Sequence, residues 1–243
     1  MDIAKLTNEY YSKLCCCNID SISNGVHFIE SDNRNEVMLG FDRKFTIYVY
    51  SSTDKIIIAY SPKYHDEFEE IKKTTKFTNI IDLLFVRFPK LVTRKLFMYV
   101  GNKDIDTTGS LKMKEQHYPY YEKFFLTLHP NINISDGWLK EYYNDKAKKG
   151  YMFGYFENDL LVSFSDAPDM PYMNDIIQHT GIATLKEYRY KGYAKRTSYF
   201  AAQELIKSGV CPQWETDKSN IASINLAKSI GYVEVADAHI LEE

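Results

Sequence analysis

The sequence is poor in the features that mark metal-binding proteins. Its 243 residues contain four cysteines, and three of them, Cys15, Cys16 and Cys17, are adjacent. Adjacent side chains point in different directions in a helix or a strand, so they cannot form a CxxC-type clamp. No second cluster of cysteine and histidine completes a zinc site. We therefore expect no metal, and four reduced, mostly buried thiols.

Long hydrophobic runs and an excess of one charge are also missing. No run approaches the roughly 18 apolar residues that a membrane span needs, and the first residues, MDIAK, lack the basic-then-apolar order of a secretory signal. Thirty Lys and Arg face 33 Asp and Glu, for a net charge of −3. That balance argues against a nucleic-acid binder that relies on bulk charge. We expect a soluble, cytoplasmic protein without a membrane or nucleic-acid partner.

The apolar pattern predicts helices and strands on both sides of a polar segment, 101–110 (GNKDIDTTGS), which is the best linker candidate. Before it we expect helices over 2–16, 65–73 and 79–88 and strands over 26–30, 36–40, 45–50, 55–60 and 96–100. After it we expect helices over 117–128, 136–147, 192–208 and 219–230 and strands over 151–157, 160–165, 176–184, 212–216 and 232–235. The predicted class is α/β, with one domain over 1–105 and another over 111–243.

The segment Arg189–Ala194 (RYKGYA) has the composition of an anion-binding turn. It stands between a predicted strand and a predicted helix, and the first N–H groups of a helix lack an intrahelical partner. Gly192 lets the backbone approach an anion, and Ala194 keeps the second contact small. Arg189 and Lys191 supply positive charge. No G-K-[ST] or G-x-G-x-x-G occurs, so the turn favours a pyrophosphate outside the nucleotide-triphosphate and nicotinamide classes.

Three motifs in order resemble the GNAT superfamily of N-acetyltransferases. They are IATLKEYRYKGYA (182–194), WETDKSN (214–220) and ASINLAKSIGY (222–232). Family members carry R/Q-x-x-G-x-G/A between a strand and a helix, then a strand ending at Asn and a helix ending in G-F or G-Y. The resemblance covers roughly the last half of the chain. It implies a mixed, splayed central sheet flanked by helices over 111–243, preceded by either a degenerate GNAT-like half or a structural, dimer-forming domain.

The resemblance also implies acetyl-CoA as cosubstrate and direct attack by a primary amine, most simply that of a small molecule. The pyrophosphate would lie on the turn, the pantetheine arm on the strand before it, and a backbone amide of that strand would stabilise the oxyanion. The cofactor-binding residues expected on this basis are Ile182, Ala183, Thr184, Arg189, Tyr190, Lys191, Gly192, Tyr193, Ala194 and Asn220.

The general base and the general acid are left open by the motifs. His179, at or near the place of a Glu in some members, can titrate near neutrality, and Glu215 is the second candidate base. Many members have a Tyr seven residues after Asn220 to protonate the thiolate, but here that residue is Ala227. Ser223, one turn earlier, or water would replace it. Because this Tyr is missing, a second function is also open: the protein would bind acyl-CoA as a sensor or scaffold, without robust catalysis.

The sequence says least about which amine accepts the acetyl group. Asp169 and Asp175, at the predicted 167–174 loop, could attract a cationic amine. Aminoglycosides, polyamines, amino acids and protein N-termini all satisfy that requirement. His65, His117 and His129 have no partners at metal spacing, and we expect them to be structural or surface residues.

Overall fold

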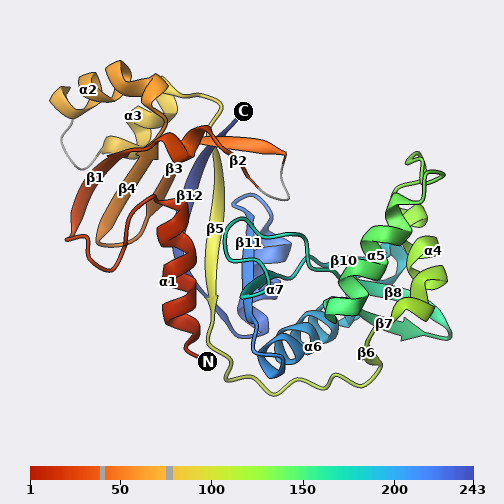
Figure 1. The fold of residues 1–243 in the computed structure, drawn as a ribbon. Helices are drawn as coiled ribbons and strands as arrows, with labels where there is room; N and C mark the ends of the chain where they lie inside the picture. The colour runs from red at the N-terminus through yellow and green to blue at the C-terminus, as the bar shows by residue number, and fades with distance from the viewer. Residues whose placement is uncertain (39–41, 75–78) are drawn as a thin grey trace.

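The protein is built on two β-sheets of different size (Figure 1). The computed structural model describes residues 1–38, 42–74 and 79–243. The large sheet has the strand order β1-β4-β3-β12-β5-β11-β9, with β2 paired to β3, and the small sheet has the order β10-β8-β7-β6. Parallel and antiparallel pairs both occur. Helices flank the sheets, as the predicted α/β class requires.

The elements agree with most of the predicted ranges. The first group comprises α1 (Ile3–Leu14), β1 (Gly25–Glu30), β2 (Val37–Met38), β3 (Arg43–Ser51), β4 (Lys55–Tyr60), α2 (His65–Thr74), α3 (Ile80–Arg87) and β5 (Val92–Tyr99). The second comprises β6 (Ser110–Lys112), α4 (Tyr118–Leu128), α5 (Trp138–Lys149), β7 (Phe153–Glu157), β8 (Leu160–Ser165), β9 (Ile177–His179), β10 (Ala183–Thr184), α6 (Tyr193–Lys207), β11 (Cys211–Asp217), α7 (Ile221–Ser229) and β12 (Tyr232–Glu242). The end of the strand predicted over 36–40 falls outside the described residues.

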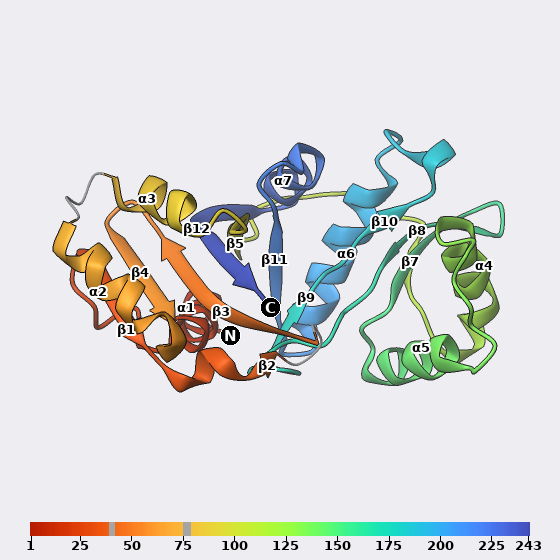
Figure 2. The same ribbon diagram turned by 90° about the horizontal axis from the view of Figure 1, so that it is seen from above.

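The strand predicted over 176–184 is two strands in different sheets. β9 pairs in parallel with β11, and β10 pairs antiparallel with β8 (Figure 2). The Thr180 N–H still donates to the Gln213 carbonyl at 3.2 Å, but the next N–H, of Gly181, donates to the Asp166 carbonyl at 2.9 Å. The chain therefore changes sheets between these two residues. This is the splay that the family resemblance implies.

Strand pairing crosses the predicted division between 1–105 and 111–243. β12 lies between β3 and β5 and pairs antiparallel with both, while β5 also pairs with β11. Strands from before and after the polar connection thus alternate within one sheet. β12 also continues to Glu242, well beyond the predicted end at 235, because it has a partner on each side. The two-domain division stays a prediction, although the amino-terminal strands have no sheet of their own.

The helices cover the sheets on opposite faces. α1 contacts β11, β5 and β9, and α7 contacts β11 and β12. Along β11, Gln213 bonds to Tyr11 of α1 and Trp214 bonds to Ser223 of α7. Since successive strand side chains point to opposite faces, α1 and α7 lie on opposite sides. α6 contacts β6, β7 and β8 as well as β11, so it bridges the two sheets.

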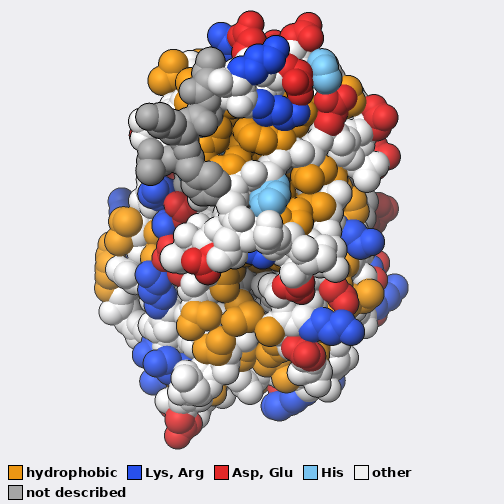
Figure 3. Space-filling model, turned by 90° about the vertical axis from the view of Figure 1, so that its left-hand side faces the viewer, with side chains coloured by type: hydrophobic (Ala, Val, Ile, Leu, Met, Phe, Trp, Pro, Cys, Tyr) orange, Lys and Arg blue, Asp and Glu red, His pale blue; other side chains and the backbone are white. Residues whose placement is uncertain are grey.

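The described residues hold no metal-like cluster and no long apolar helix. Among them, no group of three or more His, Cys, Asp or Glu side chains lies close enough to hold a metal ion. None of their helices has the length and hydropathy to cross a membrane. The four cysteines are free. Figure 3 shows Lys, Arg, Asp and Glu mixed across one face of the molecule, which agrees with the near balance of charge.

Candidate functional site

A cavity of about 730 Å³ lies where β10 departs from the large sheet. Its walls come from β10, the first turns of α6 and α7, and the end of α4. Nine of the ten predicted cofactor-binding residues line it: Ile182, Ala183, Thr184, Arg189, Tyr190, Gly192, Tyr193, Ala194 and Asn220. The tenth, Lys191, is exposed, and its ammonium group lies 4.8 Å from the centre of the Tyr188 ring. The structure therefore brings almost the whole predicted set to one cavity.

The start of α6 offers unpaired backbone donors to this cavity. Gly192 is the N-cap, in the left-handed region with φ 84°, and it has no side chain to cap the helix. The first backward bond of the helix runs from the Arg196 N–H to the Gly192 carbonyl at 3.1 Å. The three N–H groups between these residues belong to the helix start and have no intrahelical acceptor. Together with the helix dipole they form a cradle for an anion.

The approach to this cradle is open. A Cβ placed on Gly192 would meet no atom within 4 Å, so space exists where an anion has to lie. Tyr190 also has a positive φ, 63°, and its side chain is fully exposed. The Arg189 Nε donates to the Thr184 carbonyl at 3.2 Å, which ties the turn to the end of β10. The guanidinium charge of Arg189 is thereby held beside the cradle.

β10 presents a free edge to the cavity. The N–H groups of Gly181 and Leu185 donate to carbonyls of the β8 side, at 2.9 and 3.0 Å. Backbone groups alternate in direction along an antiparallel strand, so those of Ile182 and Thr184 point away from β8. Of these groups, the Thr184 carbonyl already accepts from Arg189 Nε. β10 is the edge strand of the small sheet, and these groups face the gap beside β11. Such an edge can pair with an extended ligand as though it were a further strand.

The start of α7 forms the opposite wall. The Asn220 side chain accepts from the Ser223 N–H at 3.1 Å and caps the helix. The Ser223 hydroxyl lines the cavity and accepts from the buried Trp214 Nε1 at 3.1 Å, which leaves its own hydrogen available for donation. Ala227 is fully buried one turn further along the helix and does not line the cavity.

A family model described as GNAT acetyltransferase matches residues 173–240, from before β9 into β12. The match confirms, for this segment, the resemblance to GNAT acetyltransferases that the sequence motifs indicated. An acetyltransferase of this family from Colwellia psychrerythraea has a similar structure, with a TM-score of 0.53, 13% identity, and coverage of 76% of each chain. At that identity the similarity establishes a shared GNAT fold.

Other solved structures resemble the chain at lower scores. A GCN5-related N-acetyltransferase-like protein from Streptococcus suis has a TM-score of 0.45 and 14% identity, covering 81% of this chain and 83% of its own. An aminoglycoside N-acetyltransferase in complex with CoA has a TM-score of 0.42 and 18% identity, covering 52% of this chain and 88% of its own. No curated protein matches the chain by sequence.

Two of the three predicted catalytic residues lie away from the cavity of this GNAT fold. His179 lies opposite Gln213 in the pairing of β9 with β11, and the Gln213 side chain hydrogen-bonds to Tyr11 of α1. Glu215 stands two residues after Gln213 on β11, so its side chain points to the same face of the sheet. Both side chains therefore face α1, and neither lines the cavity. Burial, with a smaller contribution from Arg94, lowers the pKa of His179 to about 4. Burial raises the pKa of Glu215 to about 7, against the opposing charge of Arg94.

Sequence reasoning missed His129 and Asp166. His129, expected at the surface, is exposed but also lines the main cavity and a second cavity of about 170 Å³. Asp166 follows β8 directly and lines the second cavity. The sequence signal that could have pointed to Asp166 is its position as a carboxylate directly after the buried strand β8. The two loop aspartates named instead are paired with lysines: Asp169 with buried Lys146, and Asp175 with Lys149 at 3.6 Å.

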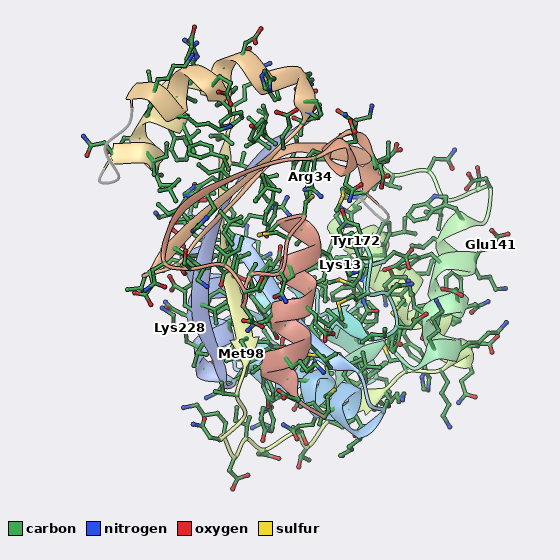
Figure 4. The ribbon with its side chains drawn as sticks, turned by 60° about the vertical axis from the view of Figure 1, so that its left-hand side comes forward. Lys13, Arg34, Met98, Glu141, Tyr172 and Lys228 are labelled. Atoms are coloured by element: carbon green, nitrogen blue, oxygen red, sulfur yellow. The ribbon has the colours of Figure 1, made fainter. Side chains whose placement is uncertain are left out.

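The segment between β8 and β9, which follows Asp166, is fixed by contacts to distant parts of the fold. Arg34, on the turn after β1, donates to the Tyr172 hydroxyl at 2.8 Å, and Figure 4 shows these two side chains meeting. The Gln178 Nε2 donates to the Pro168 carbonyl at 2.6 Å. The amino-terminal part of the chain thus helps to position the segment that follows Asp166.

Proposed function

We propose that this protein transfers an acetyl group from acetyl-CoA to a primary amine. The observation that carries the proposal is that one cavity combines the uncapped start of α6 with the free edge of β10. The first suits a pyrophosphate, and the second suits the amide groups of a pantetheine arm. The volume of about 730 Å³ lies within the usual range for small-molecule sites.

The chain's own groups have distinct parts in this proposal. The N–H groups after Gly192 and the Arg189 charge would hold the pyrophosphate, while a free N–H of β10 would stabilise the oxyanion as the amine attacks. Ser223 is our candidate for donating a proton to the leaving thiolate. Its hydroxyl lines the cavity and Trp214 orients it.

For the general base we propose Glu215 ahead of His179 among the residues named from sequence. A base works best when its pKa lies near the working pH, which suits a value of about 7 better than a value of about 4. Because both side chains face α1, a chain of water molecules would have to connect either one with the amine.

The pH dependence of turnover tests Glu215. A base must be deprotonated, so kcat/KM should rise as the pH passes through about 7. Glu215→Gln should remove this rise and lower kcat/KM at pH 8 by roughly 100-fold, since no proton acceptor remains. A variant that retained the rise and the rate would exclude Glu215 as the base.

Acetyl-CoA binding tests the proposed function itself. Isothermal titration of the purified protein should show saturable binding, and a coupled assay of CoA release over an amine library should find an acceptor. No binding of acetyl-CoA would refute the proposal.

The alternative function is an acyl-CoA sensor or scaffold. It is favoured by Ala227 at the place of the family tyrosine and by the distance of His179 and Glu215 from the cavity lining. Acetyl-CoA binding without thiol release over the whole amine library would support it. Robust release with any one amine would exclude it.

A further inference from the structure

A second cavity adjoins the proposed cosubstrate cavity on the side of α4. It has a volume of about 170 Å³ and shares four wall residues with the larger one, Leu128, His129, Ile182 and Ala183. Ile182 also contributes the first backbone groups of the free β10 edge. A molecule in the smaller cavity would therefore lie beside the strand on which the acyl donor is proposed to lie.

The remaining walls are mostly aromatic. They are Tyr121, Phe124 and Phe125 of α4, Phe164 of β8, and Asp166. The Phe164 ring lies 4.6 Å from that of Tyr121 and 6.0 Å from that of Phe124, so the aromatic rings support one another. Such walls favour a ligand with an aromatic or apolar body.

Asp166 supplies the one carboxylate among the lining residues of this cavity. Its Oδ2 accepts from the Tyr142 hydroxyl at 3.3 Å. Its Oδ1 lies 2.2 Å from where a Cβ on Gly181 would stand, so the missing side chain of Gly181 lets the carboxylate reach the splay. Burial raises the pKa of Asp166, while Tyr142 and Lys146 oppose that effect. A cation in the cavity would favour the charged carboxylate.

We propose that the second cavity is the acceptor subsite, that it takes a primary amine with an aromatic or apolar body, and that Asp166 binds its ammonium group. This inference rests on the proposed function. The ammonium group gives one proton, through water, to the proposed base Glu215, and the freed nitrogen lone pair forms a bond to the thioester carbonyl carbon. The C–S bond breaks and sulfur takes its electron pair. Ser223 gives its proton to the thiolate and takes the second proton of the nitrogen in exchange, and Glu215 returns its proton to solvent.

Binding to the CoA-saturated protein tests the subsite without turnover. We would titrate phenethylamine, 3-phenylpropionate and putrescine, which respectively have ring and ammonium, ring and carboxylate, and ammonium without a ring. Phenethylamine should bind at least tenfold more tightly than either of the others, because it alone matches both the aromatic walls and Asp166.

Asp166→Asn separates the charge from the shape of this site. The variant should weaken phenethylamine binding at least tenfold and reduce kcat/KM for this amine by at least the same factor, with acetyl-CoA affinity unchanged. Phe125→Leu should reduce the preference for phenethylamine over putrescine by several-fold, because Phe125 is half-buried in the cavity wall. Thermal melting of each variant checks that it is folded.

The matched control is Asp159→Asn. Asp159 lies in the turn between β7 and β8, is exposed, and has φ 61°, a conformation that Asn accepts readily. Binding and turnover should stay within twofold of the parent protein.

Two outcomes separate this inference from the proposed function. Failure to bind acetyl-CoA would refute the function and the inference together. Acetyl-CoA binding and turnover with equal kcat/KM for phenethylamine and putrescine, or with an unchanged Asp166→Asn variant, would overturn the inference alone.

Discussion

Two helices begin at the same cavity, and they begin in different ways. The start of α7 is satisfied within the chain, because the Asn220 side chain accepts the Ser223 N–H. The start of α6 has Gly192 as its N-cap, and no side-chain cap forms. The first helix end is thus completed by its own sequence, whereas the second keeps its donors for an external acceptor. The residue at the N-cap, Asn220 or Gly192, thus distinguishes the capped start of α7 from the start of α6 that we propose to bind the pyrophosphate.

The largest expected effect comes from placing an acid at the start of α6. Gly192→Asp puts a carboxylate where the pyrophosphate is proposed to lie, and the helix donors would bind that carboxylate instead. Acetyl-CoA affinity, measured by isothermal titration, should fall by roughly 100-fold or more.

Gly209→Asp is the matched control for this change. Gly209 follows the other end of α6, has φ 80°, and like Gly192 would place a Cβ with no atom within 4 Å. The strain of a side chain at positive φ is therefore similar, whereas the new carboxylate meets the negative end of the helix dipole at Gly209 and the positive end at Gly192. Thermal melting of both variants separates an effect on stability from an effect on acetyl-CoA affinity. Equal loss of affinity in both variants would contradict the assignment of the α6 start as the anion site.

An intermediate effect is expected at the start of α7, mainly on stability. Asn220→Ala removes the cap and should lower the free energy of unfolding by about 1 kcal/mol, whereas Asn220→Asp preserves the acceptor and should cost less. Denaturant unfolding measures both. If Asn220→Ala left stability unchanged but abolished acetyl-CoA binding, the contrast between the two helix starts would be reversed.

The smallest effect is expected from the charges around the α6 start. Arg189→Gln should weaken acetyl-CoA binding by a few-fold, and the difference should shrink as ionic strength rises, because Arg189 is exposed. Lys191→Gln should change affinity less, since Lys191 is outside the cavity lining. Titrations at low and high salt compare them, and a larger effect at Lys191 would oppose the geometry described here.

The features predicted well are local ones. The helices predicted over 192–208 and 219–230 begin at Gly192 and Asn220, and both helix starts depend on residues within one or two turns. Five of the nine predicted cofactor-binding residues at the cavity lie in the single backbone turn Arg189–Ala194, whereas Asn220 reaches the cavity through the packing of α7. Local geometry of this kind is encoded in spacing.

The features predicted poorly depend on distant partners. Nothing in the pattern of 176–184 shows that Gly181 turns to Asp166 while Thr180 stays with Gln213. The directions of His179 and Glu215 follow from their register against β11 and from the position of α1. The catalytic candidates were therefore chosen by residue type, and the structure sets two of them outside the cavity lining.

The sequence by itself determined the α/β class, most of the helices and strands, and the turn at Arg189–Ala194 that precedes α6, because short-range backbone sterics and helix capping decide these. Only the tertiary structure decided that one predicted strand divides between two sheets, that β12 inserts between β3 and β5, and that Asp166 lies beside the splay. Strand pairing is chosen among partners far apart in the chain, so it is settled by the packing of the whole molecule.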